Sequence, residues 1–132
     1  MNAERDLQKL ISGMSPVLDP ARYVFATTPD PEKHATLNAI MRFKEDEGET
    51  LILRKADAVA ARIEQLGDFA RITLSVTSAL DAVGFLAAVC SALADAGIST
   101  NAVAAYHHDH IFVPFGRAEE AMQVLQYLSE AS

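Results

Sequence analysis

The sequence has few of the features that mark membrane-bound, secreted or nucleic-acid-binding proteins. A single cysteine, Cys90, excludes internal disulfides and is typical of a reducing cytoplasm. Only 11 basic residues stand against 18 acidic ones, and the net charge of −7 argues against binding to nucleic acid or to an anionic membrane. No apolar stretch approaches the roughly 20 residues of a membrane span, and the charged start MNAERDLQKL lacks the apolar core of a secretion signal. We therefore expect a soluble, acidic, cytoplasmic protein.

What the sequence does have is hydrophobic periodicity, and half of its 132 residues are hydrophobic. In the second half the expected elements are a strand at 70–76, a helix from Phe85 that ends at Gly97, a hairpin at 100–107 and 110–114, and a helix at 118–128. In the first half they are a helix at 7–14, a strand at 22–28, a hairpin at 37–54 that turns at Gly48, and a helix from 56 to 66 capped by Gly67. Gly67-Asp68 is the expected boundary between two domains, 1–66 and 67–132.

Three stretches of the sequence resemble the ACT-domain family. They are SALDAVGFL at 78–86, AGISTNAV at 96–103, and HDHIFVP at 108–114 taken together with EDEGETLIL at 45–53. Within the family the chain is similar to bacterial stand-alone proteins with tandem ACT-like domains, to the regulatory half of aspartate kinase and to the arginine-sensing ACT proteins.

This resemblance implies an α+β fold with two ferredoxin-like βαββαβ units in tandem, each an antiparallel sheet with helices on one face. The second half lacks one strand of such a unit. We expect the first half to lend it, from Pro16–Asp19 or from Arg22–Thr28.

The resemblance also implies a function: non-catalytic, regulatory binding of a small molecule, most often an amino acid, at the interface between paired domains. No cofactor is expected. A homodimer or a higher homo-oligomer is expected. Carried over onto this sequence, the ligand-binding residues are Ser78, Ala79, Leu80, Asp81, Val83, Gly84, Phe85, Asn101 and Val103.

Physical chemistry gives reasons for a site at the loop before the helix at Phe85. The unpaired N–H groups of a helix start carry partial positive charge and attract a carboxylate. Asp81 either caps this helix or binds an ammonium group. Gly84 is interpreted as a point of close backbone approach, because glycine near a helix start costs about 1 kcal/mol relative to alanine. Asn101 either directs its amide toward the loop or lies on an exposed strand face.

Two alternatives remain open. The fold could serve as a dimerisation scaffold with a vestigial ligand loop. His108 and His110 would share one face of a strand and could bind a metal ion, although a third ligand is not evident in the sequence. The same histidines are also explained by a surface turn made by Asp109 or by pH sensing. Cys90 is interpreted as a buried structural thiol, and no motif of a catalytic site is present, so we do not expect an enzyme.

Overall fold

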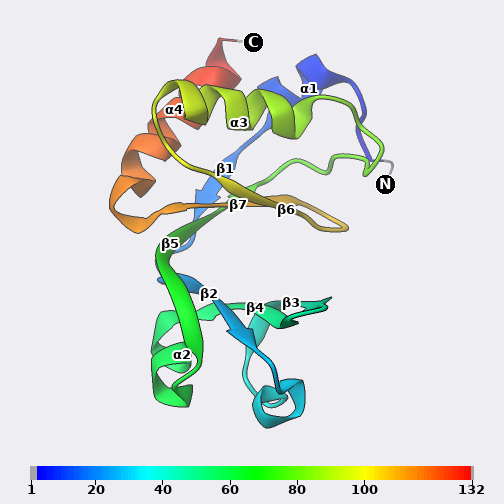
Figure 1. Cartoon of the computed structure of the whole chain (residues 1–132). Helices are drawn as coiled ribbons and strands as arrows, with labels where there is room; N and C mark the ends of the chain where they lie inside the picture. The colour runs from blue at the N-terminus through cyan, green and yellow to red at the C-terminus, as the bar shows by residue number, and fades with distance from the viewer. Residues whose placement is uncertain (1–2, 132) are drawn as a thin grey trace. The chain divides into compact units, whose positions relative to one another are not determined.

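The computed structural model describes residues 3–131 and divides the chain into two compact units (Figure 1). Ala21–Phe69 form the small unit, and Met1–Pro20 together with Ala70–Ser132 form the large unit. The strand β5, Glu64–Leu74, contributes its first part to the small unit and its last part to the large unit. Among the described residues, no helix has the length and apolar character needed to cross a membrane.

The small unit is a four-stranded sheet with the strand order β3-β4-β2-β5, in which neighbouring strands are antiparallel. Its elements are β2 (Tyr23–Thr28), the 3-10 helix η1 (Pro31–His34), β3 (Ala39–Glu45), β4 (Gly48–Arg54), α2 (Lys55–Ala61) and the start of β5. Its core consists of Val24, Ala26, Leu51, Leu53, Ala58 and Ile63. The element order is βαββαβ, with a single 3-10 turn in the place of the first helix.

The predicted helix from 56 to 66 is wrong beyond Ala61. The helix α2 ends there because Arg62 adopts a left-handed conformation with φ 55°. Gly67 does not cap a helix but lies inside β5 with φ +139°, where a Cβ would come within 2.9 Å of the Phe69 ring. The pairing register of β5 with β2 shifts at this point, so the glycine permits a bulge in the strand. Leu66, which completed the helical spacing in the sequence, is 75% exposed on the strand.

Next to this bulge, Asp68 on β5 binds Lys55 at the start of α2 and Arg22, the residue before β2. Its carboxylate accepts hydrogen bonds from Arg22 Nη1 at 2.7 Å and from Lys55 Nζ at 2.5 Å. The hydrogen bond from Lys55 and then that from Arg22 hold the pKa of Asp68 below its ordinary value. The charged form of this carboxylate therefore stabilises the folded state.

We expect Asp68→Asn to destabilise the protein in a pH-dependent way. Because the folded pKa is lowered, the contribution is fully present above the unfolded value of about 3.9 and is lost as the pH falls below it, toward the folded pKa. Urea unfolding of wild type and variant between pH 7 and pH 3 measures the difference in free energy of unfolding. Asp46→Asn, in the exposed turn between β3 and β4, is the control for loss of one charge. A difference that stays constant down to pH 3 would contradict the assignment.

The large unit is a second four-stranded sheet with the order β1-β5-β7-β6. Its elements are α1 (Leu7–Gly13), β1 (Pro16–Leu18), the end of β5, α3 (Phe85–Asp95), β6 (Asn101–Ala104), β7 (Asp109–Pro114), the 3-10 helix η2 (Phe115–Arg117) and α4 (Ala118–Glu130). The three helices cover one face of its sheet (Figure 1). The strand missing from the second half is β1, which pairs antiparallel with β5 and places Leu18 opposite Ile72. The predicted α+β class with two ferredoxin-like units is confirmed.

The division into units differs from the one expected at Gly67-Asp68. Residues 66 and 67 are the third and fourth residues of β5, so no linker lies at this point of the chain. The first 20 residues belong to the large unit because Leu10, Ile11 and Met14 are buried in its core with residues of α3 and α4. The large unit is thus built from both ends of the chain.

Candidate functional site

The loop between β5 and α3 in the large unit leads into a helix start without a side-chain cap. Gly84 is the N-cap residue of α3 and has φ +90°, a conformation that L-residues with a side chain rarely adopt. No side chain caps this start by a hydrogen bond. The N–H groups of the first helical turn have no partner within the helix, so this end of α3 presents donors and partial positive charge.

A hollow of about 130 Å³ lies at this helix start. It is lined by Ser78, Ala79, Leu80, Ala82, Gly84, Phe85, Leu86, Ala87, Ala104 and Asp109. Most of these residues are small or apolar, and the acidic group among them is Asp109, at the first position of β7, which is 5% exposed. Ser78 is also buried, and its Oγ donates a hydrogen bond to Asp109 Oδ2 at 2.9 Å. The hollow therefore brings together a carboxyl group and the positive end of a helix.

These two features suit a ligand that carries both charges. A carboxylate is stabilised by the N–H groups of a helix start, and an ammonium group is stabilised by a carboxylate inside a partly buried site. A free α-amino acid has both groups on one carbon atom.

A wider groove adjoins the hollow and shares Ser78, Ala79 and Leu80 with it. Its other lining residues are Ala3, Arg5, Thr77, Asp81, Tyr106 and His107. Arg5 Nε donates to Asp81 Oδ1 at 2.9 Å, and both side chains are largely exposed. The Tyr106 and His107 rings meet edge to face with centroids 4.9 Å apart. The groove thus presents a positive charge from Arg5, a negative charge from Asp81 and an aromatic surface.

The residues predicted to bind a ligand divide into three groups. Ser78, Ala79, Leu80, Gly84 and Phe85 line the hollow, and Asp81 lines the groove. Val83 is 84% exposed beside Gly84. Asn101 and Val103 lie on β6 and line neither the hollow nor the groove.

Two interpretations of this loop are corrected by the structure. Asp81 does not cap α3, since its carboxylate pairs with Arg5. Gly84 is not a point of close backbone approach, because a Cβ there would meet only Leu7 Cδ2, at 3.6 Å. The glycine is needed instead for its left-handed conformation.

Asp109 is the residue that sequence reasoning missed. It was expected to make the hairpin turn, but it is buried on the helix-covered face of β7, where Ile111 and Val113 follow at alternate positions. An alternating pattern places Asp109, Ile111 and Val113 on one face of the strand. An acidic residue in phase with a buried apolar pair was the signal that could have revealed it.

The histidines lie out of phase with Asp109. His110 Nδ1 is 3.0 Å from Thr73 Oγ1, and burial lowers the pKa of His110, with smaller effects from the charges of Arg71 and His108. His108 Nδ1 is buried without a hydrogen-bond partner. Across residues 3–131, no three His, Cys, Asp or Glu side chains come together as a possible metal site. The metal-binding alternative therefore gains no third ligand.

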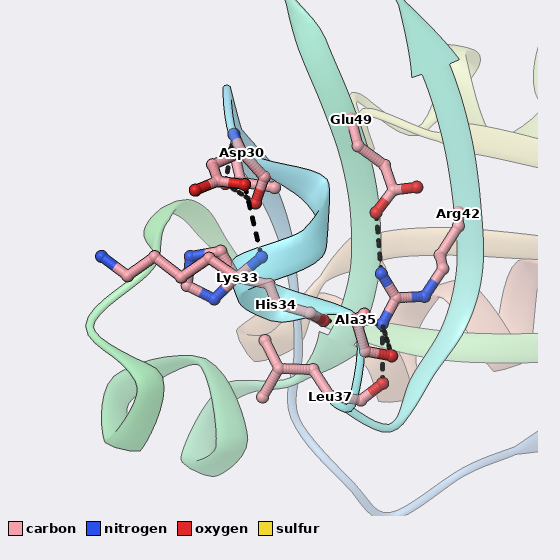
Figure 2. Close-up of polar contacts among 8 residues, drawn as sticks. Asp30, Lys33, His34, Ala35, Leu37, Arg42 and Glu49 are labelled. Atoms are coloured by element: carbon pink, nitrogen blue, oxygen red, sulfur yellow. Dashed lines mark hydrogen bonds and ion pairs between the residues drawn. The ribbon is translucent and has the colours of Figure 1, made fainter.

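The small unit has a different structure at the corresponding point, after its first strand β2 (Figure 2). The 3-10 helix η1 is capped by Asp30, whose carboxylate accepts from the Lys33 N–H. Arg42 on β3 then fastens the chain that follows. It donates to Glu49 Oε1 at 2.7 Å and to the carbonyl oxygens of His34 at 3.0 Å and Leu37 at 2.8 Å. In the small unit, the loop after β2 is therefore held by the Asp30 cap and by the hydrogen bonds of Arg42.

Comparisons with known proteins agree with this architecture. Two family models of the ACT domain match the chain, one over residues 2–70 and the other over residues 68–127. A crystal structure of a Vibrio cholerae protein, described as of unknown function and a possible transport protein, is similar with 41% identity and a TM-score of 0.84, and the match covers 93% of this chain and 95% of that one. No curated protein matches the sequence.

Two further solved structures share the fold at low sequence identity. An Agrobacterium tumefaciens protein is 15% identical with a TM-score of 0.73, over 88% of this chain and 89% of that one. The regulatory subunit of aspartate kinase from Thermus flavus is 15% identical with a TM-score of 0.64, over 87% of this chain and 95% of that one. These two likenesses concern the fold alone.

Proposed function

Because this chain belongs to the ACT-domain family, we propose that it is a non-catalytic regulatory protein that binds a free amino acid in the hollow of the large unit. ACT domains typically bind amino acids in regulatory roles. The observation that carries the proposal is the presence of the buried Asp109 carboxyl group and the uncapped start of α3 in one hollow.

In this proposal the ligand's α-carboxylate accepts hydrogen bonds from the first N–H groups of α3, and its ammonium group donates to Asp109. The hollow has a volume of about 130 Å³. That space suits the five heavy atoms of an amino acid backbone. A side chain longer than that of alanine would extend past Ser78 and Leu80 into the groove beside Arg5 and Tyr106.

Three large apolar side chains on the loop before α3 and in the adjoining groove are exposed, and they support an assembled form. Leu80 is 70% exposed, Val83 84% and Tyr106 80%. Exposed apolar groups around a ligand site favour contact with another protein surface, and a second copy of this chain is the partner we propose. Binding then acts by favouring one arrangement of the assembly, to the extent that the ligand prefers it.

The setting of Cys90 supports a binding role and a cytoplasmic location in this proposal. Burial raises the pKa of its thiol, which disfavours the thiolate that a nucleophile needs. A free thiol also persists most readily in the reducing cytoplasm.

A thermal-shift screen of the twenty amino acids tests the proposed function. A ligand at 100 times its dissociation constant stabilises the folded state by about 2.7 kcal/mol, which raises the melting temperature by several degrees. For each amino acid that binds, analogues lacking one charged group are the controls; for alanine these are lactate and ethylamine. We expect both analogues to fail. If no amino acid shifts the melting temperature at millimolar concentration, or if lactate acts as well as alanine, the proposal is wrong.

A further inference from the structure

The N-terminal segment Ala3–Asp6 lies against the loop between β5 and α3, residues 75–84, which we call the ligand loop (Figure 1). Backbone hydrogen bonds join the segment to this loop. The Glu4 N–H donates to the Thr77 carbonyl oxygen at 2.9 Å, and the Ala79 N–H donates to the Glu4 carbonyl oxygen at 2.9 Å. The two bonds form a parallel bridge between Glu4 and Ser78. One residue of the segment thus holds the loop on both sides of Ser78, the residue that donates to Asp109.

The other end of this segment is fixed to the core of the large unit. Asp6 caps α1 by accepting from the Lys9 N–H at 3.0 Å. Leu10 and Ile11 of that helix are buried in the core cluster with α3 and α4. The segment is therefore anchored by α1, and its attachment to the loop restrains the loop relative to the core.

We propose that residues 3–6 form a strap that holds the ligand loop in its binding conformation, so that the N-terminal segment positions the site without touching the ligand's backbone. This inference rests on the proposed function for its ligand. Ala3 and Arg5 line the groove, but no residue of the strap lines the hollow, so the strap supports the site and does not fill it.

The strap also makes ligand binding and the N-terminus interdependent. A loop that is already ordered costs less entropy to bind a ligand, so the strap raises affinity. By reciprocity, a ligand that holds the loop stabilises the attached strap by the same factor. Binding of a ligand in the hollow thereby changes the stability of residues 3–6, which lead through α1 to β1.

Glu4→Pro and Glu4→Ala are a matched pair that tests the strap. Proline removes the N–H that bonds to Thr77, whereas alanine removes only the side chain and keeps both backbone bonds. We expect Glu4→Pro to accelerate hydrogen exchange of the Ala79 amide by about tenfold without ligand, the effect of about one lost backbone hydrogen bond. Glu4→Ala is expected to stay within about threefold of wild type.

The same variants are then titrated with the amino acid that gives the largest thermal shift on the wild type. Glu4→Pro is expected to bind it about five- to tenfold more weakly, and Glu4→Ala as tightly as wild type. The proposed role of the strap is wrong if hydrogen exchange at the Ala79 amide is unchanged in Glu4→Pro. It is also wrong if exchange is faster in Glu4→Pro but the affinity for the amino acid is unchanged. If the wild type binds no amino acid, the proposed function fails, and the ligand-free exchange at Ala79 alone decides on the strap.

Discussion

Asp109→Asn is expected to weaken amino acid binding by at least about 30-fold while leaving the protein folded. Removing one partner of a buried, hydrogen-bonded charge pair costs about 2–5 kcal/mol of binding free energy, and each 1.4 kcal/mol is about a factor of ten. The asparagine amide keeps the size of the carboxyl group, and its oxygen can still accept from Ser78 Oγ. The dissociation constant from calorimetric titration is the measurement.

The matched control is Asp81→Asn. The two acidic residues border adjoining spaces, but Asp81 is exposed and pairs with Arg5, whereas Asp109 is buried in the hollow. For alanine, whose side chain would not reach the groove, we expect the control to change the dissociation constant by less than about threefold, because exposed ion pairs contribute little. The role assigned to Asp109 is contradicted if the Asp109→Asn variant binds the ligand as tightly as wild type. It is also contradicted if Asp109→Asn and Asp81→Asn lose affinity equally.

Arg42→Met is expected to lower the free energy of unfolding of the small unit by about 2–3 kcal/mol. The methionine keeps part of the aliphatic stem but leaves Glu49, whose side chain is 10% exposed, without its cation. It also removes the donors to the carbonyl oxygens of His34 and Leu37 (Figure 2). Breaking a fully buried pair costs about 3–5 kcal/mol, and we reduce that figure because the Arg42 side chain is 30% exposed.

Urea denaturation followed by circular dichroism, together with hydrogen exchange at residues 34–54, measures this loss. Arg54→Met removes an exposed arginine from the neighbouring strand β4 and is expected to change stability by less than about 0.5 kcal/mol. Glu49→Gln in the Arg42→Met background should recover part of the stability, since the uncompensated charge is then absent. Equal stability of Arg42→Met and Arg54→Met would rule out the role given to the Arg42 network.

Local periodicity was enough to predict most of the fold. The strand at 70–76 and the helix after Gly84 were recognised because one face of each is buried, which imposes an alternating or a helical pattern. The stretch from Ile63 to Leu66 was misread because its apolar spacing continued that of α2. The strand that replaces the expected helix end is set by pairing with β2, which is distant in sequence.

The borrowed strand was predicted only as one of two candidates for a similar reason. Pro16–Leu18 is three residues long, too short to carry a period of its own. What makes it a strand is its pairing with Ile72–Leu74, more than 50 positions away. Such pairing is not visible in local composition.

The candidate site shows the same limit. The helix start at Gly84 is predicted from the resemblance of residues 78–86 to the ACT ligand loop, and the chemistry of a helix start supports it. Its acidic partner was sought nearby in sequence, at Asp81. The carboxyl group in the hollow is instead Asp109, which bonds to Ser78 across 31 positions.

The pairing of β1 with β5 has a consequence for how the chain is put together. The Asp19 N–H donates to the Arg71 carbonyl oxygen at 2.9 Å, and the strand pairs continue from Leu18 and Ile72. Pro20 and Ala70 are thus the two ends of a β-hairpin whose turn has been replaced by the 49 residues from Ala21 to Phe69. In gene terms, the small unit is an insertion within the large one. A cut near residue 66 would separate β1 from the strand residues Ile72–Leu74 with which it pairs.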